Sequence, residues 1–370
     1  MAHLASCSQG ALSQRVTEAH AAFLTSWRRR GAPWDEWTAV VERARRRFAG
    51  LVGAGEDEVA VVSCASEGAH QVASSLPLED GRRTWVVTDL EFPSIAHVWR
   101  AQAEARGVRL RRVPAPGGSV DPDRLLAAIG PDVALVSVPL VAYANGLRPP
   151  VAEVVARARA VGARVFVDAY QGVGVLPVDV RRLGCDYLVA GALKYLLGAP
   201  GIAFLYVRRE VVSDHRPSHT GWFGRRDPFA FDPDTLDYAP DARRFEIGTP
   251  AVPAAYAADA GLSLVAELDL AALWPRLEGL AQDLQERLLA LGARLASPLD
   301  PARRGPQVTV RTDHPQELAA FLAARGVIAS PRGRAVRFAL HHHTDLADVE
   351  RAAAGVAAFA AATALEEGRG

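Results

Sequence analysis

The chain has 370 residues, with 42 Lys and Arg against 42 Asp and Glu, and a mean hydropathy of +0.04. This balance argues against a dedicated nucleic-acid binder, and neither a signal peptide nor an apolar run long enough to cross a bilayer is evident. Three cysteines without a CxxC pair argue against a disulfide scaffold and are typical of a reducing cytoplasm. We therefore expect a cytoplasmic protein whose partners include neither nucleic acid nor membrane.

Short β-branched runs alternate with stretches of helical spacing through the first 250 residues. Strands are expected at residues 59–63, 84–90, 109–113, 133–138, 164–168, 187–190 and 202–207. Helices are expected between them at residues 67–76, 94–106, 121–129 and 150–161. This alternation predicts the α/β class, with a mostly parallel seven-stranded sheet that helices cover on both faces.

The pattern changes after residue 250. A helical tract at 252–291 leads to short strands at 307–312, 327–330 and 335–340 and then to a final helix at 344–365. Two more helices, at 11–29 and 34–49, precede the first strand. The expected organisation has three parts: an N-terminal helical segment (1–50) at the domain junction, a large domain (51–250), and a smaller C-terminal α+β domain (251–370).

A single lysine, Lys194, stands among 41 arginines. Arginine replaces lysine well in salt bridges and phosphate clamps, but its guanidinium keeps its proton at ordinary pH and cannot attack a carbonyl carbon. The lone lysine is therefore a candidate nucleophile. Asp168 ends an apolar strand, where an unpaired carboxylate is costly to bury, and Lys194 follows the next strand along the chain.

A carboxylate and a lysine at neighbouring strand ends suit pyridoxal phosphate. The ring nitrogen of this cofactor needs a negative partner, and its aldehyde needs a lysine for a Schiff base. Asp168 and Lys194 are candidates for these two roles. The sequence lacks a dinucleotide fingerprint, a Walker A motif, HExxH and GxSxG. The tract from His341 to His343 is interpreted as a polar loop, so no metal site is expected.

The sequence resembles the class V aminotransferase group of fold type I pyridoxal-phosphate enzymes, which includes cysteine desulfurases, kynureninases and isopenicillin N epimerase-like proteins. The resemblance is carried, in family order, by SCASEGAHQVA (63–73), EFPSI (91–95), VAYANGLRPP (141–150), VFVDAYQGVGVLPVDV (165–180), DYLVAGALKYLLGAPGIAFLYV (186–207), GWFG (221–224), RRFEIGTP (243–250) and AVRFALHHHTDLADVER (335–351). GWFG and the residues around the lysine are most similar to kynureninases. These segments span most of the chain.

The resemblance implies a role for each candidate site residue. Ala65 and Ser66 are expected at the cofactor phosphate, at a helix N-terminus whose amides suit an anion. Phe92 is expected to stack on the pyridine ring, and Gln171 to form a hydrogen bond with the phenolic oxygen of the cofactor. Arg337 is expected to clamp the substrate carboxylate.

The other implied residues are less well determined. Tyr143 is expected near the substrate, while Asn145, the sole asparagine, is either a cofactor ligand or part of an Asn-Gly turn. Thr249 aligns with a threonine that reaches the phosphate of a neighbouring subunit, which implies a homodimer with shared sites. Trp222 is expected at the pocket or at the dimer interface.

Two departures from the family pattern limit what the resemblance implies. The family often has Ser and His at the third and first positions before the lysine, where this chain has Gly191 and Leu193. Some phosphate contacts must therefore come from elsewhere. Cysteine desulfurases keep a nucleophilic cysteine in the segment that matches 327–334, and no cysteine follows Cys185. Chemistry through an enzyme persulfide is therefore not expected.

The resulting hypothesis is a pyridoxal-phosphate enzyme that acts on a small α-amino acid through Lys194. Kynureninase-like cleavage of a C–C or C–S bond at the β-carbon is favoured. Transamination and epimerisation are the alternatives, and a non-catalytic binding protein of the same fold is a third.

Overall fold

The computed structural model describes residues 1–78 and 81–367. Its large sheet has seven strands in the order β2-β8-β7-β6-β5-β3-β4. Their bounds are β2 (Val59–Val62), β3 (Thr84–Thr88), β4 (Arg109–Val113), β5 (Val133–Pro139), β6 (Arg164–Asp168), β7 (Tyr187–Gly191) and β8 (Ala203–Val207). The pairs among β3 to β7 are parallel, whereas β8 runs antiparallel to both β7 and β2. The predicted seven-stranded, mostly parallel sheet is confirmed.

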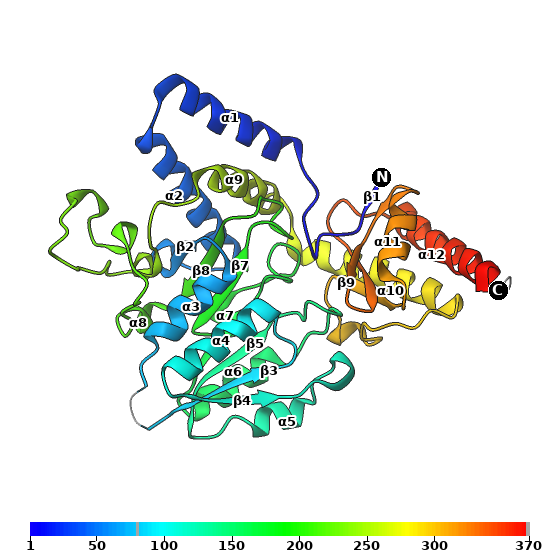
Figure 1. Ribbon diagram of the computed structural model, residues 1–370, viewed down its shortest axis with the longest axis horizontal. Coiled ribbons are helices and arrows are strands. Elements are labelled where there is room, and N and C mark those ends of the chain that lie inside the picture. Colours follow the sequence, from blue (N-terminus) through cyan, green and yellow to red (C-terminus); the bar gives the residue numbers. More distant parts are fainter. Residues whose placement is uncertain (79–80, 368–370) are drawn as a thin grey trace.

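Helices cover both faces of this sheet (Figure 1). One face packs against α2 (Trp34–Leu51), α5 (Pro122–Ala127), α6 (Val151–Ala160) and α9 (Val252–Ala266). The other packs against α3 (Ala65–Ser75), α4 (Pro93–Ala105) and α8 (Arg209–Val212). Successive strand residues point to opposite faces: Val59 belongs to the first core and Ala60 to the second. Both faces are apolar, which explains the near-continuous hydrophobic strand sequences.

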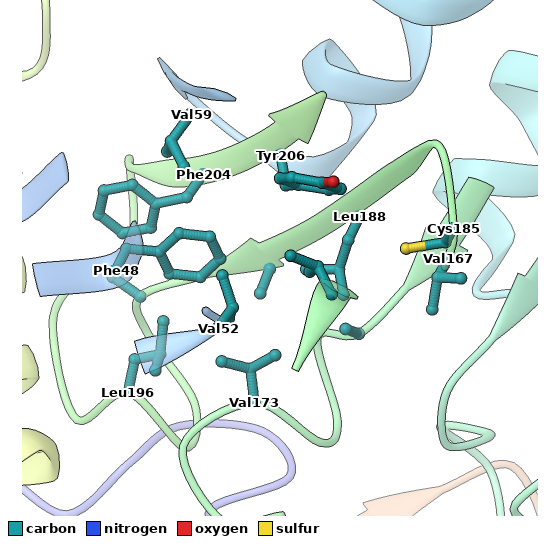
Figure 2. Packing of buried hydrophobic residues seen from close by; sticks show 14 of the residues in the cluster. Phe48, Val52, Val59, Val167, Val173, Cys185, Leu188, Leu196, Phe204 and Tyr206 are labelled. Atoms are coloured by element: carbon teal, nitrogen blue, oxygen red, sulfur yellow. The ribbon is translucent and has the colours of Figure 1, made fainter. Parts of the chain in front are cut away.

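Aromatic packing fixes the first face against α2. The ring of Phe48 from α2 stacks on Phe204 of β8, with ring centroids 4.6 Å apart and an interplanar angle of 13°. Figure 2 shows this pair beside Val52, Val59 and Leu196. Leu196 lies two residues after Lys194, so the same core holds the segment that carries the lysine.

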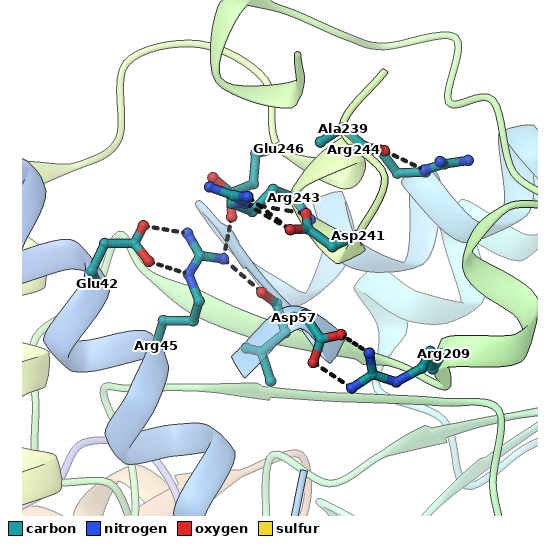
Figure 3. A network of polar contacts seen from close by, with 10 residues as sticks. Glu42, Arg45, Asp57, Arg209, Ala239, Asp241, Arg243, Arg244 and Glu246 are labelled. Carbon is teal, nitrogen blue, oxygen red and sulfur yellow. Dashed lines mark hydrogen bonds and ion pairs between the residues drawn. The ribbon is translucent and has the colours of Figure 1, made fainter. Parts of the chain in front are cut away.

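A buried ion pair between Arg45 of α2 and Glu246 holds the backbone of the edge strand β2 (Figure 3). Arg45 Nη1 lies 2.6 Å from Glu246 Oε1 and donates to the Val59 carbonyl oxygen, while Glu42 binds the same guanidinium. Glu246 Oε1 also accepts the Val61 amide proton at 2.9 Å. Removing one partner of such a pair would leave a buried charge uncompensated. The network therefore fixes β2, whose chain continues directly into α3.

The remaining elements form two small sheets and the helices around them. β9 (Gln307–Arg311), β11 (Ser330–Arg332) and β12 (Ala335–Ala339) form an antiparallel sheet in the order β11-β12-β9. β1 (Ala2–His3) pairs in parallel with β10 (Val327–Ile328). The helices here are α10 (Leu270–Ala290), α11 (Pro315–Ala323) and α12 (Leu346–Glu367). Figure 1 shows the N-terminus beside these elements, whereas α1 (Gln14–Arg30) packs against α9.

The structure corrects several predicted elements. The tract at 252–291 is two helices, because Asp269 caps α10 by accepting from the amides of Ala271 and Ala272. The predicted strand at 327–330 is divided between β10 and β11, which pair with different partners. The pattern missed β1, α11, α8 and the one-turn helix α7 (Val180–Leu183), which are short or depend on distant partners. The three-part domain division stays a prediction.

Within the described ranges, none of the helices is both long enough and apolar enough to cross a membrane.

Candidate active site

The predicted residues converge on a cavity of about 290 Å³ at the carboxyl ends of β5, β6 and β7. Ligands of open α/β sheets bind at this edge, because the loops that follow adjacent parallel strands meet there. Eight predicted residues line the cavity: Ala65, Ser66, Phe92, Tyr143, Asp168, Gln171, Lys194 and Arg337. A larger and more open cleft between α2, α9 and the start of α10 contains none of them.

Lys194 lies in the turn that follows β7. Its Nζ is 4.2 Å from the centroid of the Tyr170 ring and 5.5 Å from that of Phe92. Burial lowers the pKa of Lys194 to about 8, although the nearby Asp168 carboxylate acts in the opposite direction. At pH 7 about a tenth of this amine is therefore unprotonated and nucleophilic, far more than for a lysine with an unshifted pKa.

Asp168 is the last residue of β6, and its side chain is buried. Its Oδ1 accepts the backbone amide proton of Tyr170 at 3.0 Å. Burial raises the pKa of Asp168, while the Tyr170 amide and the Lys194 charge lower it. A cationic ring nitrogen placed beside this carboxylate would supply the charge partner that burial makes valuable.

The start of α3 forms another wall of the cavity. Cys64 precedes the helix, and no side chain caps the first amides, so the N–H groups of Ala65 and Ser66 lack that partner. Unpaired amides and the positive end of the helix dipole favour an anion such as a phosphate.

Gln171 and an aromatic pair occupy the cavity wall between these groups. Gln171 Nε2 donates to the Cys7 carbonyl oxygen at 3.0 Å, and its buried Oε1 has no partner in the described part of the chain. The rings of Phe92 and Tyr143 meet edge to face with centroids 5.0 Å apart. Phe92 thus presents an apolar surface close to the lysine amine.

Arg337 on β12 reaches the cavity from the smaller antiparallel sheet. It is 1% exposed; its Nη1 donates to the Tyr143 carbonyl oxygen and its Nη2 to Ser330 Oγ, both at 2.7 Å. Its Nε has no hydrogen-bond partner, and no carboxylate of residues 1–78 or 81–367 pairs with it. A buried cation without a counterion is costly, so this arginine favours binding of an anionic group within the cavity.

Three predicted site residues lie outside the cavity wall. Asn145 is buried, but its amide binds the backbone: Nδ2 donates to Gly118 and Ala296, and Oδ1 accepts from Leu147. This is the turn alternative for Asn145, since Gly146 has φ +77°. Trp222 packs among Trp34, Phe223, Phe229 and Phe231. Thr249 is exposed to solvent, away from the cavity of its own chain.

The structure adds cavity residues that the sequence did not indicate. Cys7 and Ser8 line the wall because β1 anchors the N-terminus beside β10, which no local pattern signals. Two of the three cysteines, Cys7 and Cys64, therefore face the cavity. Arg332 and Tyr170 also line it, and the position of Tyr170 two residues after Asp168 was the one available signal.

The histidine tract lies close to the end of β12. His341 is buried; one ring nitrogen contacts the Tyr195 carbonyl oxygen, and the other accepts from the His342 amide. The ligand nitrogens of His341, His342 and His343 lie within 4.8 Å of one another, and the interpretation of the tract as a polar loop stays a prediction.

Comparison with known proteins identifies the family. The family model "Aminotransferase class-V" matches residues 9–362. The chain belongs to the class-V aminotransferase family. It is similar to an uncharacterized aminotransferase of Bacillus subtilis, YcbU, with 36% identity over 96% of this chain and 93% of that protein. It is also similar to a kynureninase of Deinococcus radiodurans, with 32% identity over 94% of this chain and 85% of that protein.

Solved structures of lower identity share the fold. A cysteine desulfurase of Thermococcus onnurineus aligns with a TM-score of 0.85 at 24% identity, covering 96% of this chain and 94% of that one. The cystine C–S lyase C-DES aligns with a TM-score of 0.87 at 22% identity, covering 96% of this chain and 97% of that one. The fold is that of fold type I pyridoxal-phosphate enzymes, and this class-V protein is a pyridoxal-phosphate-dependent enzyme.

The cavity residues fit this cofactor. The uncapped start of α3 suits the phosphate, and the Gln171 Oε1 is a buried polar atom without a partner in the described part of the chain. Asp168 lines the same cavity as the only lysine of the sequence. The donor and acceptor chemistry of this class-V site therefore agrees with pyridoxal phosphate.

A second buried carboxyl group, Glu91, lies behind the cavity. Its Oε1 accepts from Ser137 Oγ at 2.9 Å, and that hydroxyl accepts in turn from Trp99 Nε1. Its Oε2 has no partner in the described part of the chain. Burial, with the nearby Asp168 charge, raises the pKa of Glu91 to about 8. Glu91 is therefore mostly protonated at pH 7 and adds no second full negative charge beside Asp168.

Replacing Glu91 by Gln should change how stability depends on pH. Because the folded pKa of about 8 exceeds the unfolded value of 4.5, Glu91 makes the fold less stable as pH rises through this window. Glu91→Gln removes this loss, which is about 5 kcal/mol over the full window between the two pKa values. Denaturant unfolding of the variant at pH 5, 6.5 and 8 measures the effect. The exposed Glu286→Gln is the matched control, and equal slopes for both variants would contradict a neutral Glu91.

Proposed function

We propose that this enzyme cleaves a C–C or C–S bond at the β-carbon of a small α-amino acid, with Lys194, Asp168 and Arg337 as its principal residues. The observation that carries the substrate class is Arg337, a buried cation without a carboxylate partner, in the same cavity as the lone lysine. An α-carboxylate is planar and accepts two parallel N–H groups. The unpaired Nε–H of Arg337 can donate one of these two hydrogen bonds.

Lys194 and Asp168 have separate roles in the proposed reaction. Lys194 would hold the aldehyde carbon of pyridoxal phosphate, and the bound cofactor would supply a sink for negative charge at the substrate Cα. Asp168 keeps the ring nitrogen protonated by its negative charge. The free amine of Lys194, whose pKa burial lowers to about 8, would remove and return the Cα proton near neutral pH.

The kynureninase relatives support β-cleavage, since one of them is 32% identical over 94% of this chain. The second candidate is transamination, which the relative named as an aminotransferase favours at 36% identity. Epimerisation is a third outcome of the same Cα chemistry.

Product analysis with a panel of amino acids separates these outcomes. Cleavage of a β C–C bond leaves alanine, and elimination across a β C–S bond gives pyruvate and ammonia. Transamination gives the 2-oxo acid of the substrate, and epimerisation inverts Cα. We expect alanine or pyruvate as the main product. A 2-oxo acid that retains the substrate side chain would contradict the lyase proposal and support the aminotransferase.

Persulfide formation on the enzyme is not part of the proposal, because 327–334 contains no cysteine. Cys7 and Cys64 line the cavity, so these are the thiols on which a persulfide would be sought. With cysteine as substrate, mass spectrometry should detect no protein persulfide. A persulfide on either thiol, with turnover lost in the corresponding Ser variant, would establish the opposite.

Arg337→Ala should raise KM for amino acids about 10- to 100-fold, since a charged hydrogen-bonded clamp contributes about 1.5–3 kcal/mol. Steady-state kinetics on the best substrate of the panel measures the effect, with kcat changing less than KM. Arg332→Ala is the matched control, because Arg332 lines the same cavity but is exposed. Equal effects of the two variants would show that Arg337 is not the carboxylate clamp.

The enzyme is further proposed to be a homodimer in which Thr249 reaches the cofactor phosphate of the other subunit. The exposed Thr249 hydroxyl and the partly exposed aromatic cluster of Trp222, Phe229 and Phe231 support this, since neither contributes to the cavity of its own chain.

Subunit mixing tests this arrangement. Lys194→Ala and Thr249→Ala are each expected to be impaired, but a mixed dimer would contain one intact site, built from Lys194 of one chain and Thr249 of the other. Co-refolded equimolar variants should recover up to about a quarter of wild-type activity. Activity no greater than the mean of the two parents would mean that Thr249 does not act across subunits.

A further inference from the structure

Tyr170 and Gly191 lie in direct contact at neighbouring strand ends. Tyr170 follows β6 by two residues, and Gly191 ends β7, three residues before Lys194. A Cβ atom on residue 191 would overlap the hydroxyl oxygen and ring carbons of Tyr170, far inside van der Waals contact. The phenol thus occupies the space in which any side chain at position 191 would begin, and this packing requires glycine.

The Tyr170 ring lies beside the lysine, in the cavity that the start of α3 also lines. Its centroid is 4.2 Å from Lys194 Nζ, and the residue lines the cavity together with Cys64, Ala65 and Ser66. Cys64 is close enough to act electrostatically on the phenol. The Tyr170 side chain therefore shares a cavity with the uncapped amides at the start of α3.

The Tyr170 hydroxyl is available as a hydrogen-bond donor. It makes no hydrogen bond to any residue in the described ranges, although Tyr170 is half-buried. Burial, with smaller contributions from Asp168 and Cys64, raises the pKa of this phenol far above its usual value. The proton stays on the oxygen at working pH, so the group can donate to an anion.

We propose that the Tyr170 hydroxyl binds the phosphate of pyridoxal phosphate together with the N-terminus of α3. Glycine at position 191 leaves the space that the phenol occupies. The family often has a serine at position 191. In this chain the Tyr170 phenol, which follows β6, would supply a hydroxyl in place of that serine at the end of β7. The proposal rests on the cofactor and is independent of which bond the enzyme cleaves.

The test compares two ligands that differ only in the phosphate. The full-length chain, freed of cofactor, is titrated with pyridoxal phosphate and with pyridoxal, following the absorbance of the bound chromophore. Tyr170→Phe keeps the ring and removes the hydroxyl. It should weaken binding of pyridoxal phosphate about 10-fold or more while leaving pyridoxal within about 2-fold, because a hydrogen bond to a charged group contributes about 1.5–3 kcal/mol.

Tyr143→Phe is the matched control, since it removes the other phenol of the cavity wall and should leave the ratio of the two affinities unchanged. A ratio in Tyr170→Phe that stays within 2-fold of wild type, whether or not both affinities fall, would overturn the proposal. Failure of the lyase reaction would not affect this ratio, so the two proposals fail separately.

A side-chain exchange gives a second, independent measurement. Gly191→Ser alone should disturb the site, because the new Cβ overlaps Tyr170. Tyr170→Ala should lose phosphate discrimination, and Tyr170→Ala with Gly191→Ser should regain part of it, since the serine hydroxyl then has the vacated space. If the double variant favours pyridoxal phosphate over pyridoxal no more than Tyr170→Ala does, a hydroxyl in this space does not bind the phosphate.

Discussion

Burial of unlike charges in one cavity is the constraint on which this site depends. Asp168 and Lys194 follow adjacent parallel strands, and burial shifts the pKa of each toward its neutral form even though the two attract one another. Arg337 adds a buried cation that has no acidic partner. Such an arrangement lowers stability in isolation. It becomes favourable when a ligand brings a cationic ring nitrogen, an aldehyde carbon and a carboxylate to these three groups, which is what pyridoxal phosphate and an amino acid provide together.

The fold supplies the positions at which these charges are held. Both faces of the large sheet are covered, so the carboxyl edge between the strand ends is where polar groups can meet. The Arg45–Glu246 pair fixes the edge strand that leads into α3, and hence the position of the first helix amides. Glu91, behind Asp168, is mostly protonated at pH 7 and so adds no second full negative charge beside the cavity. The smaller sheet brings Arg337 to the opposite side.

Much of this arrangement could be predicted from local sequence. The strand ends at Asp168 and Lys194 follow from the alternation of strands and helices, and the rarity of lysine singled out its one example. Contacts between segments that are distant in the sequence could not be predicted from local sequence. Cys7 reaches the cavity through the pairing of β1 with β10, and Tyr170 matters because it faces a glycine on another strand. Asn145 was ambiguous, because an Asn-Gly turn and a ligand position have the same short sequence.

The central claim, that Lys194 carries the cofactor, is tested most directly by borohydride reduction of the holoenzyme followed by peptide mapping. The chain has only two amines that can form the adduct, Lys194 and the N-terminal amine. Trypsin cleaves after Arg182 and Arg208, so Lys194 lies within one peptide covering residues 183–208 when its amine is blocked. The account predicts a phosphopyridoxyl group on this peptide, at Lys194. A reduced adduct at the N-terminus alone, or none on either amine, would contradict it.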